Sequence, residues 1–193
     1  MDLDYLKVLS FIAGVLFIGA YIPYFIAIFR GQTKPAIVTW FIWATLDAIV
    51  VVGMYKKDAL NGQMTGAVIG AVSVAVLSLW YGKMTGKWMD IFCVTGAVLG
   101  IVLWKTYDDP VVGMITSLST IFLATTPTFL SVWHNPADED RTAWTIFLAS
   151  CVVSVIAIPK WTMADAAPPI TFFVIDGIVV VMLYSRPRKE ATK

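Results

Sequence analysis

The sequence predicts an all-α integral membrane protein, in which seven transmembrane helices form two parallel three-helix repeats joined by a linker helix. Three observations lead to this prediction. The 193-residue chain is 59% hydrophobic and only 14% charged, whereas soluble domains have about 45–50% apolar and about 25% charged residues. Its apolar residues fall into runs of about 17–22 residues, enough to cross about 30 Å of hydrocarbon. Much of the pattern in residues 23–47 also returns 104 residues later.

The apolar runs give the expected order of the helices. They cover residues 9–29, 36–55, 65–82, 88–105, 111–133, 142–160 and 168–185. A soluble helical bundle is disfavoured, because almost nothing remains to form its polar surface. We therefore expect one membrane domain over residues 1–193, with repeat 1 at 5–82, the linker helix at 88–105 and repeat 2 at 111–185. The first run lacks a basic leader and an obvious cleavage site, which favours a retained helix over a signal peptide.

The basic residues of the loops predict the orientation of the chain, because cytoplasmic loops carry an excess of Lys and Arg. Placing the N-terminus outside puts nine basic residues on the inner side: Arg30, Lys34, Lys83, Lys87, Arg141, Arg186, Arg188, Lys189 and Lys193. It leaves five on the outer side: Lys7, Lys56, Lys57, Lys105 and Lys160. We therefore expect an outer N-terminus and a cytoplasmic C-terminus.

Charge and cysteine content limit the partners and cofactors. The formal net charge is +1, which gives no indication of a nucleic-acid partner. Cys93 and Cys151 lie inside apolar runs, so we expect them to be small packing residues, with no disulfide and no metal site. The sequence has one histidine, His134, and shows no Ser-His pair or metal-ligand spacing. An enzyme is therefore disfavoured and no cofactor is expected, whereas a homo-oligomer is compatible with the sequence.

The internal repeat centres on a proline, a polar turn and a tryptophan. Aligning the chain with itself at an offset of 104 residues pairs Ala20 with Ala124, Pro23 with Pro127, Phe25 with Phe129, Trp40 with Trp144 and Ile42 with Ile146. Each proline should kink its helix, because it lacks the N–H that bonds one turn back. The repeat unit is three helices long. Because one odd helix lies between the copies, both copies have the same orientation in the membrane.

With these features the chain resembles the SWEET and PQ-loop transporters, which share the three-plus-one-plus-three plan. In those families a proline in the first helix of each repeat is a hinge, and Pro23 and Pro127 stand in that place. The glutamine that follows this proline in the PQ motif is absent, and Tyr24 and Thr128 stand there instead. The chain is also similar to small bacterial membrane proteins with a Gly-x-x-Lys-Pro turn before a Trp-x-x-Trp helix. This likeness adds no function, and we expect the chain to lie in a bacterial inner membrane.

Two aspartates lie in the middle of apolar runs, whereas every other charged residue can be placed in a loop, a tail or a helix end. Asp47 and Asp176 would each cost about 2.5–3.5 kcal/mol at the centre of the bilayer. Each is therefore expected to face a cavity, to be bonded to a neighbouring helix, or to be protonated. A purely structural hydrogen bond is one interpretation. A binding or conducting role for at least one aspartate is the interpretation that we favour.

The resemblance also implies which residues contact a substrate. In SWEET sugar carriers the third helix of each repeat supplies a polar residue at mid-membrane, and the matching regions here contain Ser73 and Asp176. A carboxylate in place of the neutral asparagine of those carriers favours a cationic or proton-linked substrate. On the second helix, Trp40, Trp43 and Asp47 share one face. Alternatively, the two tryptophans could lie in the aromatic belt at the membrane interface, and this interpretation suits Trp40 better than Trp43.

The predicted function is therefore a small-solute transporter that works by alternating access and is linked to protons or cations through buried aspartates. The predicted partners are a small-molecule substrate and the lipid bilayer. The hinges would be Pro23 and Pro127, and the substrate-binding residues would be Asp176, Asp47, Ser73, Trp40, Trp43, Tyr24, Trp144 and Phe147. The alternative is a seven-helix ligand-binding receptor or sorting protein that does not transport.

Overall fold

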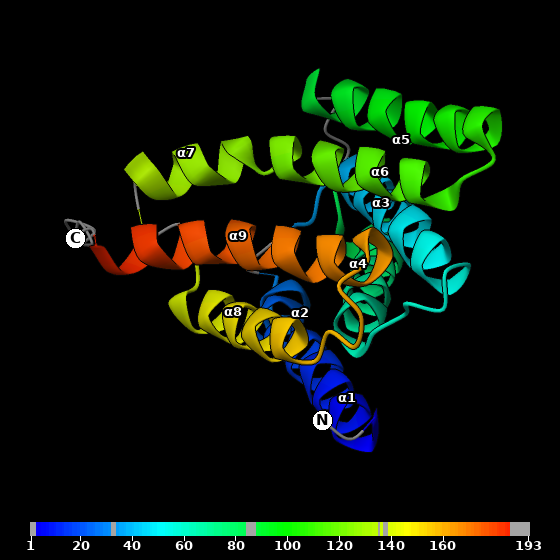
Figure 1. The fold of residues 1–193 in the computed structure, drawn as a ribbon. Coiled ribbons are helices and arrows are strands. Elements are labelled where there is room, and N and C mark those ends of the chain that lie inside the picture. The colour runs from blue at the N-terminus through cyan, green and yellow to red at the C-terminus, as the bar shows by residue number, and fades with distance from the viewer. Residues whose placement is uncertain (1–2, 32–33, 84–87, 135, 137–138, 186–193) are drawn as a thin grey trace.

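The computed structural model describes residues 3–31, 34–83, 88–134, 136 and 139–185, and within them the long elements are all α-helices. Figure 1 shows their arrangement. The helices are α1 (Leu3–Ala20), α2 (Ile22–Phe29), α3 (Ile37–Tyr55), α4 (Gly62–Tyr81), α5 (Trp88–Tyr107), α6 (Pro110–Ala124), α7 (Thr126–His134), α8 (Arg141–Ile156) and α9 (Met163–Ser185). The prediction of an all-α chain is confirmed for the described residues.

Six spans in this part of the chain are long and apolar enough to cross a membrane. They are 4–29, which joins α1 and α2, then α3, α4, 90–107 within α5, 110–134, which joins α6 and α7, and finally α9. The seventh predicted span, 142–160, is the shorter helix α8 of 16 residues. At 1.5 Å per residue α8 is about 24 Å long, which is less than the hydrocarbon thickness of about 30 Å.

The last helix begins earlier than the Pro168-Pro169 pair at which we expected it to start. Residues Met163 to Ser185 form α9, and both prolines lie inside it. Thr162 begins the helix, because its carbonyl accepts from the Ala166 N–H and its hydroxyl bonds the Asp165 carboxylate. Pro168 and Pro169 lie beyond the first turn of α9, so the carbonyl groups of Ala164 and Asp165 lack the N–H donors that a regular helix would supply.

Two of the spans are broken where the prolines predict a kink. Tyr21 separates α1 from α2, and Thr125 separates α6 from α7. Pro23 and Pro127 are each the second residue of the helix that follows. Pro127 has no N–H for the Leu123 carbonyl, and the Thr126 hydroxyl donates to that carbonyl at 2.7 Å instead. The predicted breaks are therefore present at both positions.

The helices pack as two groups with α5 on the outside. In the first group α4 lies between α1 and α3, and in the second α9 packs against α8, α6 and α7. The main contacts between the groups are made by α1 with α8 and by α3 with α6, while α5 covers α6 and α3. Helix α2 packs against α1 and α4 and meets α3 through Tyr24 and Trp40, and α7 packs against α6 and α9, so these two short helices pack mainly within their own groups.

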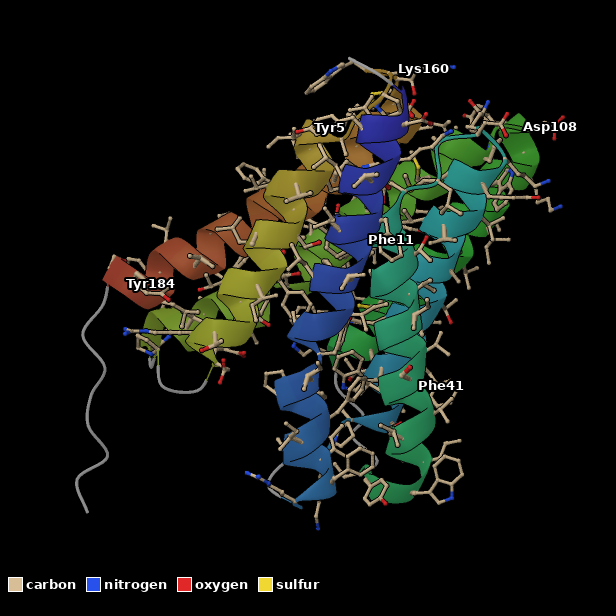
Figure 2. The ribbon with its side chains drawn as sticks, turned by 90° about the horizontal axis from the view of Figure 1, so that it is seen from below. Tyr5, Phe11, Phe41, Asp108, Lys160 and Tyr184 are labelled. Carbon is tan, nitrogen blue, oxygen red and sulfur yellow. The ribbon has the colours of Figure 1, made fainter. Side chains whose placement is uncertain are left out.

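The two groups lie closer at one end of the molecule than at the other. Figure 2 shows Tyr5, Lys160 and Asp108 at one end, whereas Tyr184 lies at the far end of α9, where α8 and α9 lean away from α2. The main hydrophobic core joins the groups and contains Phe17, Leu46, Met114 and Ile175. The core therefore connects the groups in the middle, and the helices diverge toward the Tyr184 end.

Candidate functional site

A small cavity of about 70 Å³ lies between the two helix groups. A single water molecule needs about 10–15 Å³, whereas sites for drug-sized ligands measure about 300–1,000 Å³. The cavity can therefore hold a few water molecules or one small ion in this conformation. Five residues predicted from the sequence line it: Asp47, Asp176, Trp43, Trp144 and Phe147.

The two aspartates reach this cavity from different groups of helices. Asp47 lies on α3 and is 6% exposed, and Asp176 lies on α9 and is 4% exposed. No lysine or arginine is buried among the described residues, so no basic side chain is buried beside them as a counter-ion. A carboxyl group at this depth is retained when it meets a proton, a cation or a hydrogen-bond donor.

The surroundings of the two carboxyl groups differ. The Asp176 Oδ2 accepts a hydrogen bond from the Cys151 thiol at 3.0 Å, and the Cys151 sulfur accepts one from the Gln63 amide at 3.0 Å. This chain of bonds runs from α4 through α8 to α9, so it crosses between the helix groups. The described residues offer no hydrogen bond to the Asp47 side chain. Asp47 is therefore the carboxyl group that the protein itself leaves available.

Aromatic rings surround the carboxyl groups. The Tyr21 ring lies 5.3 Å from that of Phe147 and 6.4 Å from that of Trp40. Trp40 in turn packs against Trp43, with 6.1 Å between the ring centroids. At these distances each pair of rings stabilises the fold by more than the burial of its apolar surface alone.

Two predicted aromatic residues adjoin the cavity without being among its lining residues. The Trp40 indole N–H donates to the Tyr24 hydroxyl at 3.3 Å, and their rings lie 5.4 Å apart. Trp40 contacts the lining residues Tyr21 and Trp43, so it forms a second layer behind them. Tyr24 and Trp40 therefore extend the aromatic wall along α2 and α3.

Ser73 is the predicted binding residue that lies apart from the cavity. Its hydroxyl donates to the Ile69 carbonyl on its own helix at 2.7 Å, and Ser73 does not line the cavity. Helix α4 meets the α1–α2 break through Gly70, where an added Cβ would overlap the Tyr21 ring. The face of α4 next to the break therefore carries a glycine, and the Ser73 hydroxyl bonds within its own helix.

Six lining residues were not predicted: Phe17, Tyr21, Ile121, Thr125, Phe172 and Ile175. The repeat itself contained the signal for four of them. At the offset of 104 residues Phe17 pairs with Ile121 and Tyr21 pairs with Thr125. Tyr21 and Thr125 are also the residues at which the spans break. Each predicted hinge proline therefore follows two residues after a side chain that lines the cavity.

Cys93 and Cys151 are both buried, and neither forms a disulfide in the described part of the chain. Cys151 has a further contact that the sequence did not predict, because it lies between Gln63 and Asp176. Its partner in the repeat register is Asp47. At this position of the repeat, the first half carries the Asp47 carboxyl group. The second half carries the Cys151 thiol, which donates to the Asp176 carboxyl group.

Comparisons with protein-family models, with curated proteins and with solved structures gave no match. The fold and the cavity define a multi-pass helical membrane protein. Its distinguishing feature is a pair of buried carboxyl groups from α3 and α9 that share one cavity with aromatic side chains.

Proposed function

We propose that this protein is a small-solute transporter of the bacterial inner membrane that works by alternating access and is linked to protons or cations. One observation carries the proposal: Asp47 and Asp176 come from different helix groups and line the same cavity. Two carboxyl groups without a buried basic partner can exchange protons or bind a cation, and intramembrane carboxyl groups of this kind mark ion and proton pathways.

The packing order of the helices supports the two-repeat plan. In each group the third helix contacts both of the others, as α4 does with α1 and α3, and as α9 does with α6 and α8. The first helix of each group packs on the second helix of the other, namely α1 on α8 and α6 on α3. Two parallel repeats related by an axis along the membrane normal would have these neighbours. The single helix α5 would then be the linker.

The helix breaks support alternating access. α2 and α7 follow the breaks at Tyr21 and Thr125, and their neighbours belong to their own groups. Rotation at the two breaks would move α2 and α7 relative to α1 and α6. With the N-terminus outside, the diverging ends of Figure 2 face the cytoplasm. In the proposed transport cycle, this conformation would therefore be the one that is closed to the outside.

The chemistry of the cavity supports a cation or a proton-linked solute. Trp43, Trp144 and Phe147 lie around the carboxyl groups, and aromatic faces attract cations. An uncharged sugar would gain little from two buried carboxyl groups, because each costs desolvation energy when it is ionised. We therefore expect the substrate, or the ion that accompanies it, to be positively charged.

The experiment combines binding and uptake. Purified protein is screened against metabolites by thermal shift at two pH values, and each ligand found is tested for uptake into proteoliposomes. Asparagine preserves the shape of aspartate and removes its titration. We expect Asp176→Asn and Asp47→Asn to lose the pH dependence of binding over about pH 5–8. The matched control is Asp108→Asn, which changes an exposed loop aspartate.

The outcomes separate the candidate functions. Uptake with altered pH profiles in the two variants supports the transporter. Binding without uptake favours the alternative of a receptor or sorting protein. Unchanged pH profiles in both variants would mean that the two aspartates are structural.

A further inference from the structure

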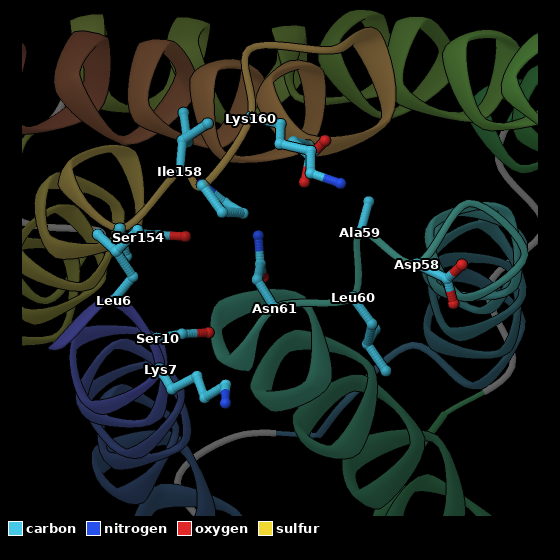
Figure 3. A pocket seen from close by; sticks show the side chains of 13 residues that line it. Leu6, Lys7, Ser10, Asp58, Ala59, Leu60, Asn61, Ser154, Ile158 and Lys160 are labelled. Atoms are coloured by element: carbon cyan, nitrogen blue, oxygen red, sulfur yellow. The ribbon is translucent and has the colours of Figure 1, made fainter. Parts of the chain in front are cut away.

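A second and larger cavity lies at the end of the molecule that carries Tyr5 and Lys160. Its volume is about 390 Å³, within the range of about 300–1,000 Å³ that is usual for small-molecule sites. It shares no lining residue with the cavity between the aspartates. Figure 3 shows that α1, the start of α4, the end of α8 and the segment leading into α9 surround it.

A buried hydroxyl group without a partner faces this second cavity. Ser154 is 2% exposed and its Oγ has no hydrogen-bond partner in the described part of the chain. Figure 3 shows the Ser154 oxygen directed into the cavity from α8. A buried polar group that stays unpaired costs free energy, so such a group is expected to meet a ligand or a water molecule.

Asn61 supplies a second donor. Its Oδ1 accepts from the Met64 N–H at 2.9 Å and so caps the start of α4. The Asn61 side-chain oxygen is used by this bond, and its amide nitrogen points into the cavity, as Figure 3 shows. The N-terminus of α4 adds a positive electrostatic potential, because the peptide dipoles of a helix leave partial positive charge there.

Four charged residues line the cavity, two of them basic and two acidic. Lys160 lies beside the cavity on the segment before α9, and Lys7 lies on α1. The pair of Lys7 with Asp4 at 3.4 Å is highly exposed, so it holds Lys7 only weakly. Two aspartates line the cavity as well. The Asp165 carboxylate is bonded by the Thr162 hydroxyl at the start of α9, and Asp58 is solvent-exposed.

We infer that this cavity binds a small solute through a carboxylate group. The carboxylate oxygens accept from the Ser154 hydroxyl and the Asn61 amide, and the Lys160 ammonium group supplies the opposite charge. Hydrogen bonds from a buried hydroxyl and an amide to a charged acceptor are stronger than bonds between neutral groups. The inference goes beyond the proposed transport function and does not depend on it, because none of these residues lines the cavity of Asp47 and Asp176.

The test uses three fluorinated probes of similar size and different charge. Trifluoroacetate is the carboxylate, trifluoroacetamide is neutral and 3,3,3-trifluoropropylammonium is the cation, because the extra methylene group keeps the amine protonated at neutral pH. Each is titrated against the purified full-length chain in lipid nanodiscs, and binding is followed by ¹⁹F NMR line broadening. We expect trifluoroacetate to bind most tightly and acetate to displace it.

Three variants test whether trifluoroacetate binds in this cavity. Ser154→Ala removes an oxygen that has no partner within the described part of the protein, so it should preserve the fold, and we expect it to weaken trifluoroacetate binding about tenfold. Lys160→Gln should weaken it severalfold. Lys105→Gln is the matched control, because Lys105 is an exposed lysine in the last turn of α5.

Equal binding of the three probes, tightest binding of the cation, or wild-type binding by both Ser154→Ala and Lys160→Gln would overturn the inference.

Discussion

At the scale of single residues, the two carboxyl groups that line the small cavity have different hydrogen-bond partners. Asp176 accepts from Cys151, which in turn accepts from Gln63, so its orientation is held by two other helices. Asp47 has no such donor in the described residues and faces the cavity directly. Of the two side chains, Asp47 is therefore the one that can rearrange around a cation at the lower cost.

Asp109 illustrates a charged residue outside the membrane spans. It precedes α6, where its carboxylate accepts from the Val111 N–H at 3.1 Å and pairs with the Lys57 ammonium group at 3.1 Å. The backbone hydrogen bond and, to a smaller extent, the contact with Lys57 lower the pKa of Asp109 below its ordinary value of 3.8. The ionised form is thus favoured in the folded protein.

We predict a small and pH-dependent loss of stability in Asp109→Asn. Asparagine retains the cap of α6 and loses the ion pair, whereas Asp109→Ala loses both and should unfold at a lower temperature. A lowered pKa in the folded state stabilises the protein at neutral pH, and this contribution disappears as the pH falls through that pKa. The advantage of the wild type over Asp109→Asn should therefore vanish in acid. Thermal unfolding curves measured across pH test this.

The control for this prediction is the neighbouring residue. Asp108 is exposed and has a positive φ of 51°, a conformation that asparagine tolerates. Asp108→Asn should therefore leave the unfolding temperature almost unchanged at every pH. Equal effects of the two asparagine variants would show that the Lys57 pair contributes nothing specific.

At the scale of helices, the first group depends on a close approach of backbones. A Cβ added at Gly62 would overlap the Ser10 carbonyl oxygen, and one at Gly14 would lie 2.7 Å from the Gly62 carbonyl oxygen. The Gly62 N–H also donates to the Ser10 hydroxyl at 2.7 Å. Small residues permit this contact between α1 and α4, as is usual for packing inside membranes.

We predict that Gly62→Ala strongly destabilises the protein, because either α1 or α4 must shift to admit the methyl group. Gly19→Ala is the matched control on α1, since a Cβ added at Gly19 would have no neighbour within 4 Å. That change should leave the unfolding temperature unchanged or raise it, because alanine favours helix over glycine by about 1 kcal/mol. Thermal unfolding in the same detergent tests both variants. Equal unfolding temperatures for the two would contradict the packing argument.

At the scale of the whole molecule, the contacts between the groups bury a natural reporter. Cys151 is 0% exposed and lies where α8 meets α4 and α9. In the proposed transport cycle the groups separate on the side of Gln63 when the outer end opens. Cys93→Ser leaves Cys151 as the only thiol, because the chain has two cysteines. Alkylation of this thiol then measures the opening.

We predict slow alkylation of Cys151 by N-ethylmaleimide in Cys93→Ser, and severalfold slower alkylation when Pro23→Ala is added. Alanine restores the backbone N–H, so α1 and α2 can join into one stiffer helix. The rate is read by mass spectrometry over time. The control is Cys151→Ser, in which Cys93 on α5 should react at a rate that Pro23→Ala does not change. An unchanged rate at Cys151 would refute the hinge role of Pro23.

Much of the architecture was predictable because its causes are local in the chain. Apolar runs predicted the helices, since length and hydropathy decide what crosses a bilayer. Prolines predicted the breaks, since a missing N–H acts within one turn. The positions of Asp47 and Asp176 in the middle of their helices followed from their places in those runs, and the shared face of Trp43 and Asp47 followed from helical periodicity.

Only the tertiary structure decided which of these residues meet. Ser73 lies on α4, but its hydroxyl bonds to its own helix, while Tyr21 and Thr125 line the cavity. The hydrogen bonds that join Gln63, Cys151 and Asp176 link three helices, and no sequence spacing encodes them. The rotation of each helix is set by packing against its neighbours, such as the fit of Gly70 against Tyr21. The sequence determined the position of each residue along its helix, and packing determined the direction in which its side chain points.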